Sequence, residues 1–324
     1  MAIKPSIVLS CRLTDEDLQF YRQMSLKYCE LVISEDQMDE EFISSQIARF
    51  RSFEIEPLFL NVPTMQKNDI IDLNLTEKNG RKVSRDDEIA KFIKLVELCG
   101  KFGIPYTSIA WQPVGVKSTA HAPSTYSHGA NTRIVDINEI LARPNDYDRE
   151  YTEDAVWENF EYFLKAVTPA CKENHVSMAL HPNDPPVAST NGVASLIWNS
   201  DCYRRAFALD KEGVLAMKFC IGCWLEGPNF GDVEADLKEF IGAGRVTMIH
   251  FRNIDKPMNP RFEETLMEDG YADMFHLLQV IMDAGYDNMI YVDHVFGDNH
   301  RVEDFAYPFG FIKGMIHSIE HQKG

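Results

Sequence analysis

Met178-Ala-Leu-His-Pro-Asn-Asp-Pro-Pro186 joins an apolar, strand-like run to a histidine and a proline-rich turn, and this arrangement is repeated further along the chain. Three later apolar runs also end in a side chain that can bind a metal. The runs Val214–Phe219, Val246–Ile249 and Met289–Val292 are followed by Cys220, His250 and Asp293. Each of these four predicted strands therefore carries one candidate ligand at its C-terminal end.

Short apolar runs alternate with longer amphipathic segments along the whole chain. Most of the runs are continuously apolar, which is typical of parallel strands covered on both faces. The eight predicted strands are Ser6–Ser10, Tyr28–Ser34, Ile55–Val62, Tyr106–Gln112, Val176–His181, Val214–Cys220, Val246–Phe251 and Met289–Asp293. Helix-start signals at Thr14, Ser84 and Thr152 and a glycine stop at Gly103 place helices between them.

Eight strand–helix units predict a (β/α)8 TIM barrel, formed as a single domain over residues 1–324. The alternative is a doubly wound open sheet. We favour the barrel because no G-x-G-x-x-G follows the first strand and the candidate ligands come after strands five to eight. Residues 112–150 are too many for a simple connection, so we predict an insertion there that acts as a lid or an oligomer contact.

The composition limits the classes of partner. No apolar run is long enough to cross a bilayer, and the first residues lack the cleavage-site pattern of a signal peptide. We therefore predict a cytoplasmic protein that does not interact with a membrane. The net charge of −18 repels phosphate backbones and argues against nucleic acid. Seven cysteines, an odd number, indicate reduced thiols rather than a disulfide framework. A homo-oligomer is a further prediction.

The candidate ligands favour a transition metal. In a barrel the C-terminal ends of the strands converge on one mouth, so His181, Cys220, His250 and Asp293 can meet there. Two imidazoles, a thiolate and a carboxylate suit Mn²⁺, Fe²⁺, Co²⁺ or Zn²⁺ better than Mg²⁺ or Ca²⁺. A single histidine or cysteine at a strand end is more often structural, but four together predict a metal site.

From about Trp157 to its end the chain resembles the mannonate dehydratase family. The motifs that carry the resemblance are Met178–Pro186, Phe219-Cys-Ile-Gly222, Ile249-His-Phe-Arg-Asn253, Phe262-x-Glu264, Asp269-Gly-x-x-Asp-Met274, Asp293-His294 and Gly310-Phe-Ile-Lys-Gly-Met315. The resemblance implies a xylose isomerase-like barrel, Mn²⁺ or Fe²⁺ on the four ligands, and His294 as a catalytic acid or base. It also implies dehydration of D-mannonate to 2-dehydro-3-deoxy-D-gluconate.

Residues near the ligands are candidates for binding the sugar acid. Arg252 lies two residues after His250, where it can pair with the substrate carboxylate or form a salt bridge in the barrel mouth. Asp184 and Glu264 can orient ligating histidines or bind hydroxyls. Asn253 fits hydroxyl recognition, although an asparagine can also serve as a helix cap.

The chain departs from the family pattern in the residues that would surround the substrate. Asn183 replaces one of two tandem acids, and Met267 stands where the family has a histidine. The family's catalytic tyrosine aligns with His300, and the nearest tyrosine is Tyr307. We therefore predict a dehydratase in which His294 shares its role with His300 or Tyr307. The alternatives are a metal-dependent sugar isomerase, epimerase or β-eliminating lyase, and a non-catalytic sugar-acid-binding barrel.

Overall fold

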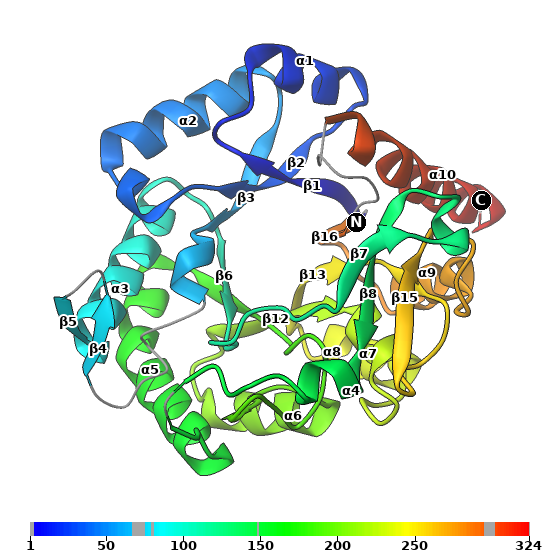
Figure 1. Ribbon diagram of the computed structural model, residues 1–324. Helices are drawn as coiled ribbons and strands as arrows, with labels where there is room; N and C mark the ends of the chain where they lie inside the picture. The colour runs from blue at the N-terminus through cyan, green and yellow to red at the C-terminus, as the bar shows by residue number, and fades with distance from the viewer. Residues whose placement is uncertain (1–2, 67–74, 79–80, 148, 295–301, 324) are drawn as a thin grey trace.

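The computed structural model describes residues 3–66, 75–78, 81–147, 149–294 and 302–323. Eight parallel strands close into a barrel in the order β1-β16-β13-β12-β9-β6-β3-β2 (Figure 1). They are β1 (Lys4–Ser10), β2 (Tyr28–Val32), β3 (Glu56–Asn61), β6 (Tyr106–Ala110), β9 (Ser177–His181), β12 (Leu215–Cys220), β13 (Val246–His250) and β16 (Met289–Tyr291). All eight predicted strands are confirmed, and closure of β1 onto β16 excludes the open sheet.

Helices surround the barrel as an outer ring (Figure 1). The longer ones are α1 (Asp15–Gln23), α2 (Glu40–Ser52), α3 (Arg85–Lys101), α5 (Glu153–Asn174), α6 (Ser200–Leu209), α8 (Val233–Gly242), α9 (Met274–Asp283) and α10 (Ala306–Lys323). The predicted caps are confirmed, because Thr14 and Ser84 form capping boxes with Asp17 and Asp87, and the Thr152 side chain accepts from the N–H of Ala155. No helix within the described residues is long and apolar enough to span a membrane.

The interior of the barrel combines an apolar layer with one buried ion pair. Phe59, Ala179, Met248, Met289 and Tyr291 form the apolar cluster. Lys218 on β12 reaches Glu30 on β2, which lies on the opposite side of the barrel, with Nζ and Oε2 2.6 Å apart. Burial alone would raise the pKa of Glu30, but the charge of Lys218 lowers it, so the carboxylate stays ionised. Lys218 precedes Cys220 by two residues on β12, so this pair lies one layer below the candidate ligands.

The long segment after β6 joins a second sheet instead of forming an irregular loop. Its strands β7 (Ala120–Pro123) and β8 (Asn131–Asp136) precede the short helix α4 (Ile137–Leu141). They continue a sheet from the connection after β13, in the order β14 (Asn253–Ile254), β15 (Arg261–Thr265), β8 and β7. In Figure 1, β7, β8 and β15 run side by side next to the barrel. Side chains on β8 can therefore reach the site from outside the barrel.

The described residues also contain two sheets of two strands each. One pairs β4 (Leu75–Lys78) with β5 (Arg81–Ser84), and the other pairs β10 (Ser189–Thr190) with β11 (Val193–Ala194). The short helix α7 (Ile221–Glu226) starts directly after β12. Its residues Cys223 and Glu226 are therefore held close to Cys220.

Candidate metal centre and active site

Four candidate ligands meet at the C-terminal ends of four neighbouring strands. His181 ends β9, Cys220 ends β12, His250 ends β13, and Asp293 lies two residues beyond β16. Their ligand atoms all lie within 4.8 Å of one another. Nδ1 of His250 is 3.1 Å from Nε2 of His181 and 3.2 Å from Oδ2 of Asp293. The convergence expected from the strand ends is therefore present.

The cluster fits a divalent metal ion. Oδ1 of Asp293 is buried without a hydrogen-bond partner among the described residues, and such a group is costly unless something satisfies it. Nδ1 of His181 lies 2.7 Å from the carbonyl oxygen of Pro182, so Nε2 is the nitrogen that faces the cluster. Two imidazoles, one sulfur and one carboxylate form a donor set for a transition metal.

Cys220 is held in the form that binds metals. Burial raises the pKa of its thiol, but a hydrogen bond from Cys223, the charge of Arg252 and a hydrogen bond from His181 together bring it well below its usual value. The thiolate is the metal ligand, so these contacts favour coordination. The pKa of Cys223 is raised instead, chiefly by burial and by the neighbouring Cys220. Cys223 therefore supports Cys220 as a hydrogen-bond donor.

His294 lies beside the cluster and is oriented by Glu264. Nδ1 of His294 is 2.6 Å from Oε1 of Glu264, and Nε2 is 3.7 Å from Oδ2 of Asp293. Burial lowers the pKa of His294, but the charges of Glu264 and Asp293 raise it to about 9. Burial likewise opposes ionisation of Glu264, yet His294 and Arg252 lower its pKa to about 2. The side chain of His294 is 31% exposed, so a substrate can reach its imidazole.

A buried network of five ionisable side chains lies behind His294. Two guanidinium groups, from Arg133 and Arg252, each contact the same three carboxylates, which belong to Asp184, Glu226 and Glu264. All five side chains are buried. The pKa of Glu226 is raised well above its usual value, mainly by burial, with Asp184 adding to it against the opposing charge of Arg252. Such a network is stable only while each charge keeps its partners.

The predicted substrate-binding residues are largely engaged by other parts of the protein. Arg252 contacts three carboxylates and places Nε 3.4 Å from Oδ2 of Asp293, which is the salt bridge in the barrel mouth that we gave as its alternative role. Asp184 pairs with both arginines, and Glu264 holds His294 instead of a ligating histidine. The amide of Asn253 donates to the carbonyls of Met267 and Ala272, so it fixes the local backbone.

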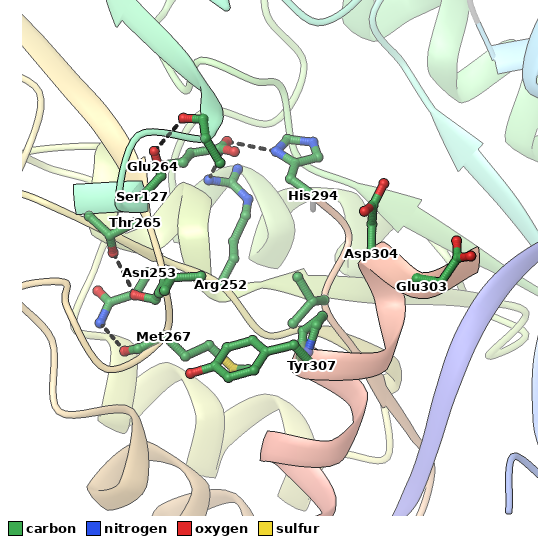
Figure 2. Close-up of a pocket in the computed structure, with 14 residues that line it drawn as sticks. Ser127, Arg252, Asn253, Glu264, Thr265, Met267, His294, Glu303, Asp304 and Tyr307 are labelled. Carbon is green, nitrogen blue, oxygen red and sulfur yellow. Dashed lines mark hydrogen bonds and ion pairs between the residues drawn. The ribbon is translucent and has the colours of Figure 1, made fainter. Parts of the chain in front are cut away.

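Of the two predicted partners of His294, the structure describes Tyr307. Tyr307 is the second residue of α10, is 49% exposed and donates its hydroxyl hydrogen bond to Glu268. It lines the same cavity as His294 (Figure 2). His300 lies outside the described residues. Tyr307 thus shares a cavity with His294, and the prediction for His300 stays a prediction.

Comparison with known proteins places this arrangement in a family. The family model described as D-mannonate dehydratase (UxuA) matches residues 129–323, which include the four ligands, His294 and β8. The chain belongs to the D-mannonate dehydratase family. A mannonate dehydratase from Oceanobacillus iheyensis is 26% identical over 274 residues, covering 74% of this chain and 76% of that protein.

Solved structures show that this family member has the same barrel as its relatives. The mannonate dehydratase from Streptococcus suis serotype 2 superimposes with a TM-score of 0.85 at 19% identity, covering 100% of this chain and 95% of that chain. A xylose isomerase domain protein from Planctomyces limnophilus gives a TM-score of 0.63 at 10% identity over 99% of both chains. The predicted family and its xylose isomerase-like barrel are confirmed.

The sequence did not reveal two members of the buried network in this dehydratase-family chain. Arg133 lies on β8 of the inserted segment, and Glu226 ends α7. Arg133 is 51 residues from Asp184, 93 from Glu226 and 131 from Glu264 along the chain. The only available signal was the unusual length of residues 112–150. No local pattern could have paired Arg133 with carboxylates so distant.

We expect Arg133 to affect catalysis although it is not one of the candidate metal ligands. We expect R133M to lower kcat roughly 100-fold with a smaller change in KM, because loss of one guanidinium leaves Glu264 and Asp184 held by Arg252 alone. R133K, which keeps the charge but loses the planar fork, should recover part of kcat. Steady-state kinetics on purified variants measures both.

The matched control for this prediction is R245M. Arg245 pairs with buried Asp210 at 2.7 Å but takes no part in the network around His294. It should lower the unfolding temperature as R133M does and leave kcat nearly unchanged. Equal kcat losses in R133M and R245M would show that general destabilisation explains the effect.

Proposed function

We propose that the protein dehydrates D-mannonate to 2-dehydro-3-deoxy-D-gluconate and water. The observation that carries this proposal is the position of His294, which is paired with Glu264 and lies directly beside the four candidate metal ligands. Membership of the D-mannonate dehydratase family and the names of the relatives support the choice of substrate. A divalent metal ion beside a histidine that can transfer a proton is suited to removing water from the carbon atoms next to a carboxylate.

The metal in this proposal is Mn²⁺ or Fe²⁺. His181, Cys220, His250 and Asp293 would hold it, and their mixed nitrogen, sulfur and oxygen donors suit these ions. When bound, such an ion lowers the energy of negative charge that develops on the oxygens of the substrate. Arg252 helps to hold Asp293 in place, because Nε of Arg252 lies 3.4 Å from Oδ2 of Asp293.

The elimination requires two proton movements. In the elimination, a proton leaves C2 and the hydroxyl group leaves C3 with a proton as water. The resulting enol then ketonises by losing its O–H proton and gaining a proton at C3. His294 carries one of these protons, since Glu264 holds its imidazole beside the ligand cluster. We assign the other proton to Tyr307 or His300. Tyr307 lines the cavity, and its pKa is raised to about 12, so its hydroxyl stays protonated.

The direct test is incubation of the purified protein with Mn²⁺ and D-mannonate. We expect a product lighter by one water, detected by mass spectrometry. A panel of other aldonates, uronates and keto-sugars separates the alternatives, because an isomerase or epimerase changes retention time without changing mass. Conversion of any panel member without loss of water, and none of D-mannonate, would overturn the proposal. Binding without conversion would identify a sugar-acid-binding barrel.

Three further predictions from the sequence are part of this proposal. We propose a single domain in which residues 112–150 form a lid or an oligomer contact, a homo-oligomer as the assembly, and the cytoplasm as the location. The insertion also contributes Arg133 to the buried network, which supports a role for it in completing the site.

A further inference from the structure

Cys220 and Cys223 form a C-x-x-C pair at the start of α7. Cys220 is the N-cap residue of this helix, so Cys223 is its third residue. Side chains at these two positions meet in other helices of the protein, because the hydroxyls of Thr14 and Ser84 each donate to the carboxylate three residues later at 2.8 Å. The two sulfur atoms of the pair are therefore expected to face each other across the first turn of α7.

The contacts around the pair agree with this position. The thiol of Cys223 donates a hydrogen bond to the sulfur of Cys220, and both side chains are buried. Nη2 of Arg252 lies 3.9 Å from Sγ of Cys223 and helps to hold that side chain in place. Two sulfurs in hydrogen-bond contact need to approach by only about 2 Å or less to reach the length of a disulfide bond. The C-x-x-C spacing is also the one that disulfide oxidoreductases use.

One sulfur of the pair is also a candidate metal ligand. Sγ of Cys220 lies within 4.8 Å of the ligand atoms of His181, His250 and Asp293. A metal binds the thiolate form of cysteine, which a sulfur in a disulfide no longer offers. Metal binding and a disulfide between Cys220 and Cys223 therefore exclude each other. His181 is partly exposed, so a molecule as small as hydrogen peroxide can approach the cluster from its side.

We propose that Cys220 and Cys223 form a reversible disulfide when the protein has lost its metal and is exposed to a peroxide. This inference goes beyond the proposed dehydration and does not depend on the substrate. The sulfur of Cys220 bonds to one oxygen of hydrogen peroxide as the O–O bond breaks, which gives a sulfenic acid and water. The sulfur of Cys223 then bonds to the sulfur of Cys220 as the S–O bond breaks, and the hydroxyl group leaves with the proton of Cys223 as water. The two thiols are oxidised and the peroxide is reduced.

The disulfide has two consequences for the site. The cluster keeps His181, His250 and Asp293 but loses its sulfur ligand, so we expect the oxidised protein to bind a transition metal more weakly. The bond also consumes the sulfenic acid before further peroxide can convert it to a sulfinic acid, which thiol reductants do not reduce. Cys223 therefore keeps the oxidation of Cys220 reversible.

The test is oxidation of the purified protein by hydrogen peroxide, with and without prior removal of metal by a chelator. After alkylation of the remaining thiols, trypsin cuts after Lys218 and Lys238 and releases both cysteines in one peptide, residues 219–238. From metal-free protein, we expect this peptide to be unalkylated and about 2 Da lighter than its reduced form, and dithiothreitol to reverse the change. Saturating Mn²⁺ should slow the oxidation at least roughly tenfold, because only the metal-free fraction reacts.

Two variants serve as controls. C223S leaves Cys220 without a partner sulfur, so peroxide should add two oxygen atoms, about 32 Da, that dithiothreitol does not remove. C99S/C171S removes another buried pair, of which one cysteine lies on α3 and the other on α5. Cys99 and Cys171 interact electrostatically across these helices. Peptide 219–238 of C99S/C171S should be oxidised as in the wild type.

Three results would overturn the proposal. The first is full alkylation of both cysteines in metal-free wild-type protein after peroxide treatment. The second is an equal rate of oxidation with and without Mn²⁺. The third is oxidation of the other five cysteines at the same rate, because that would indicate unfolding instead of a selective pair. All these measurements are peptide masses, so their outcome is separate from whether the protein dehydrates D-mannonate.

Discussion

The double substitution H181A/C220S should abolish metal binding and, with it, activity. It removes one of the two imidazoles and replaces the thiolate, leaving His250 and Asp293 as a pair that cannot hold a transition metal tightly. Elemental analysis of protein purified without chelator should find about one metal ion per chain in the wild type and almost none in the variant. Dehydratase activity should fall below detection and should not return on addition of Mn²⁺.

Matched substitutions away from the cluster test whether this loss is specific. Cys202 is a half-buried thiol at the start of α6, and His276 is an exposed histidine on α9 that pairs with Glu234. H276A/C202S therefore removes the same functional groups and should retain both metal and activity. Metal content that survives in H181A/C220S would refute the assignment of these ligands. Chelation of the wild type should lower its unfolding temperature, because a ligand that binds only the folded state stabilises it.

The barrel was predictable because its signals are local. Continuous apolar runs identify strands buried on both faces, and capping residues such as Thr14, Ser84 and Thr152 mark where helices begin. Strand ends were placed within a few residues, since the last residue of a pleated strand depends on pairing with its neighbour. The sheet that contains β8 was not predicted, because its register is set by β15, more than 120 residues later.

The ligand cluster was predictable for a topological reason, whereas the network behind it was not. Parallel strands of a closed barrel bring their C-terminal ends together whatever their spacing in the sequence, so His181, Cys220, His250 and Asp293 could be grouped. Arg133 and Glu226 meet through an inserted strand and a short helix, whose positions follow from packing. Packing also decides that Arg252 contacts protein carboxylates.

H294Q should lower kcat by about 10² to 10⁴-fold, the range expected for loss of a proton-transferring side chain. Glutamine has a similar size and its amide N–H can still donate a hydrogen bond to Glu264, but it cannot exchange a proton near neutral pH. Metal content should remain at the wild-type level, because His294 is not one of the four clustered ligands. Steady-state kinetics and elemental analysis on the same preparation separate loss of proton transfer from loss of metal.

The controls for H294Q distinguish a catalytic imidazole from a structural one. His128 pairs with Asp269 at 2.8 Å in another histidine–carboxylate contact, and its side chain is 72% exposed, so H128Q should leave kcat unchanged. E264Q keeps the imidazole but removes the carboxylate that orients and charges it, so its kcat should fall between those of the wild type and H294Q. If H294Q kept kcat within about threefold of the wild type, far less than an essential acid or base contributes, both proton transfers would have to be made by other groups. Tyr307, which lines the same cavity, would then be the next residue to mutate.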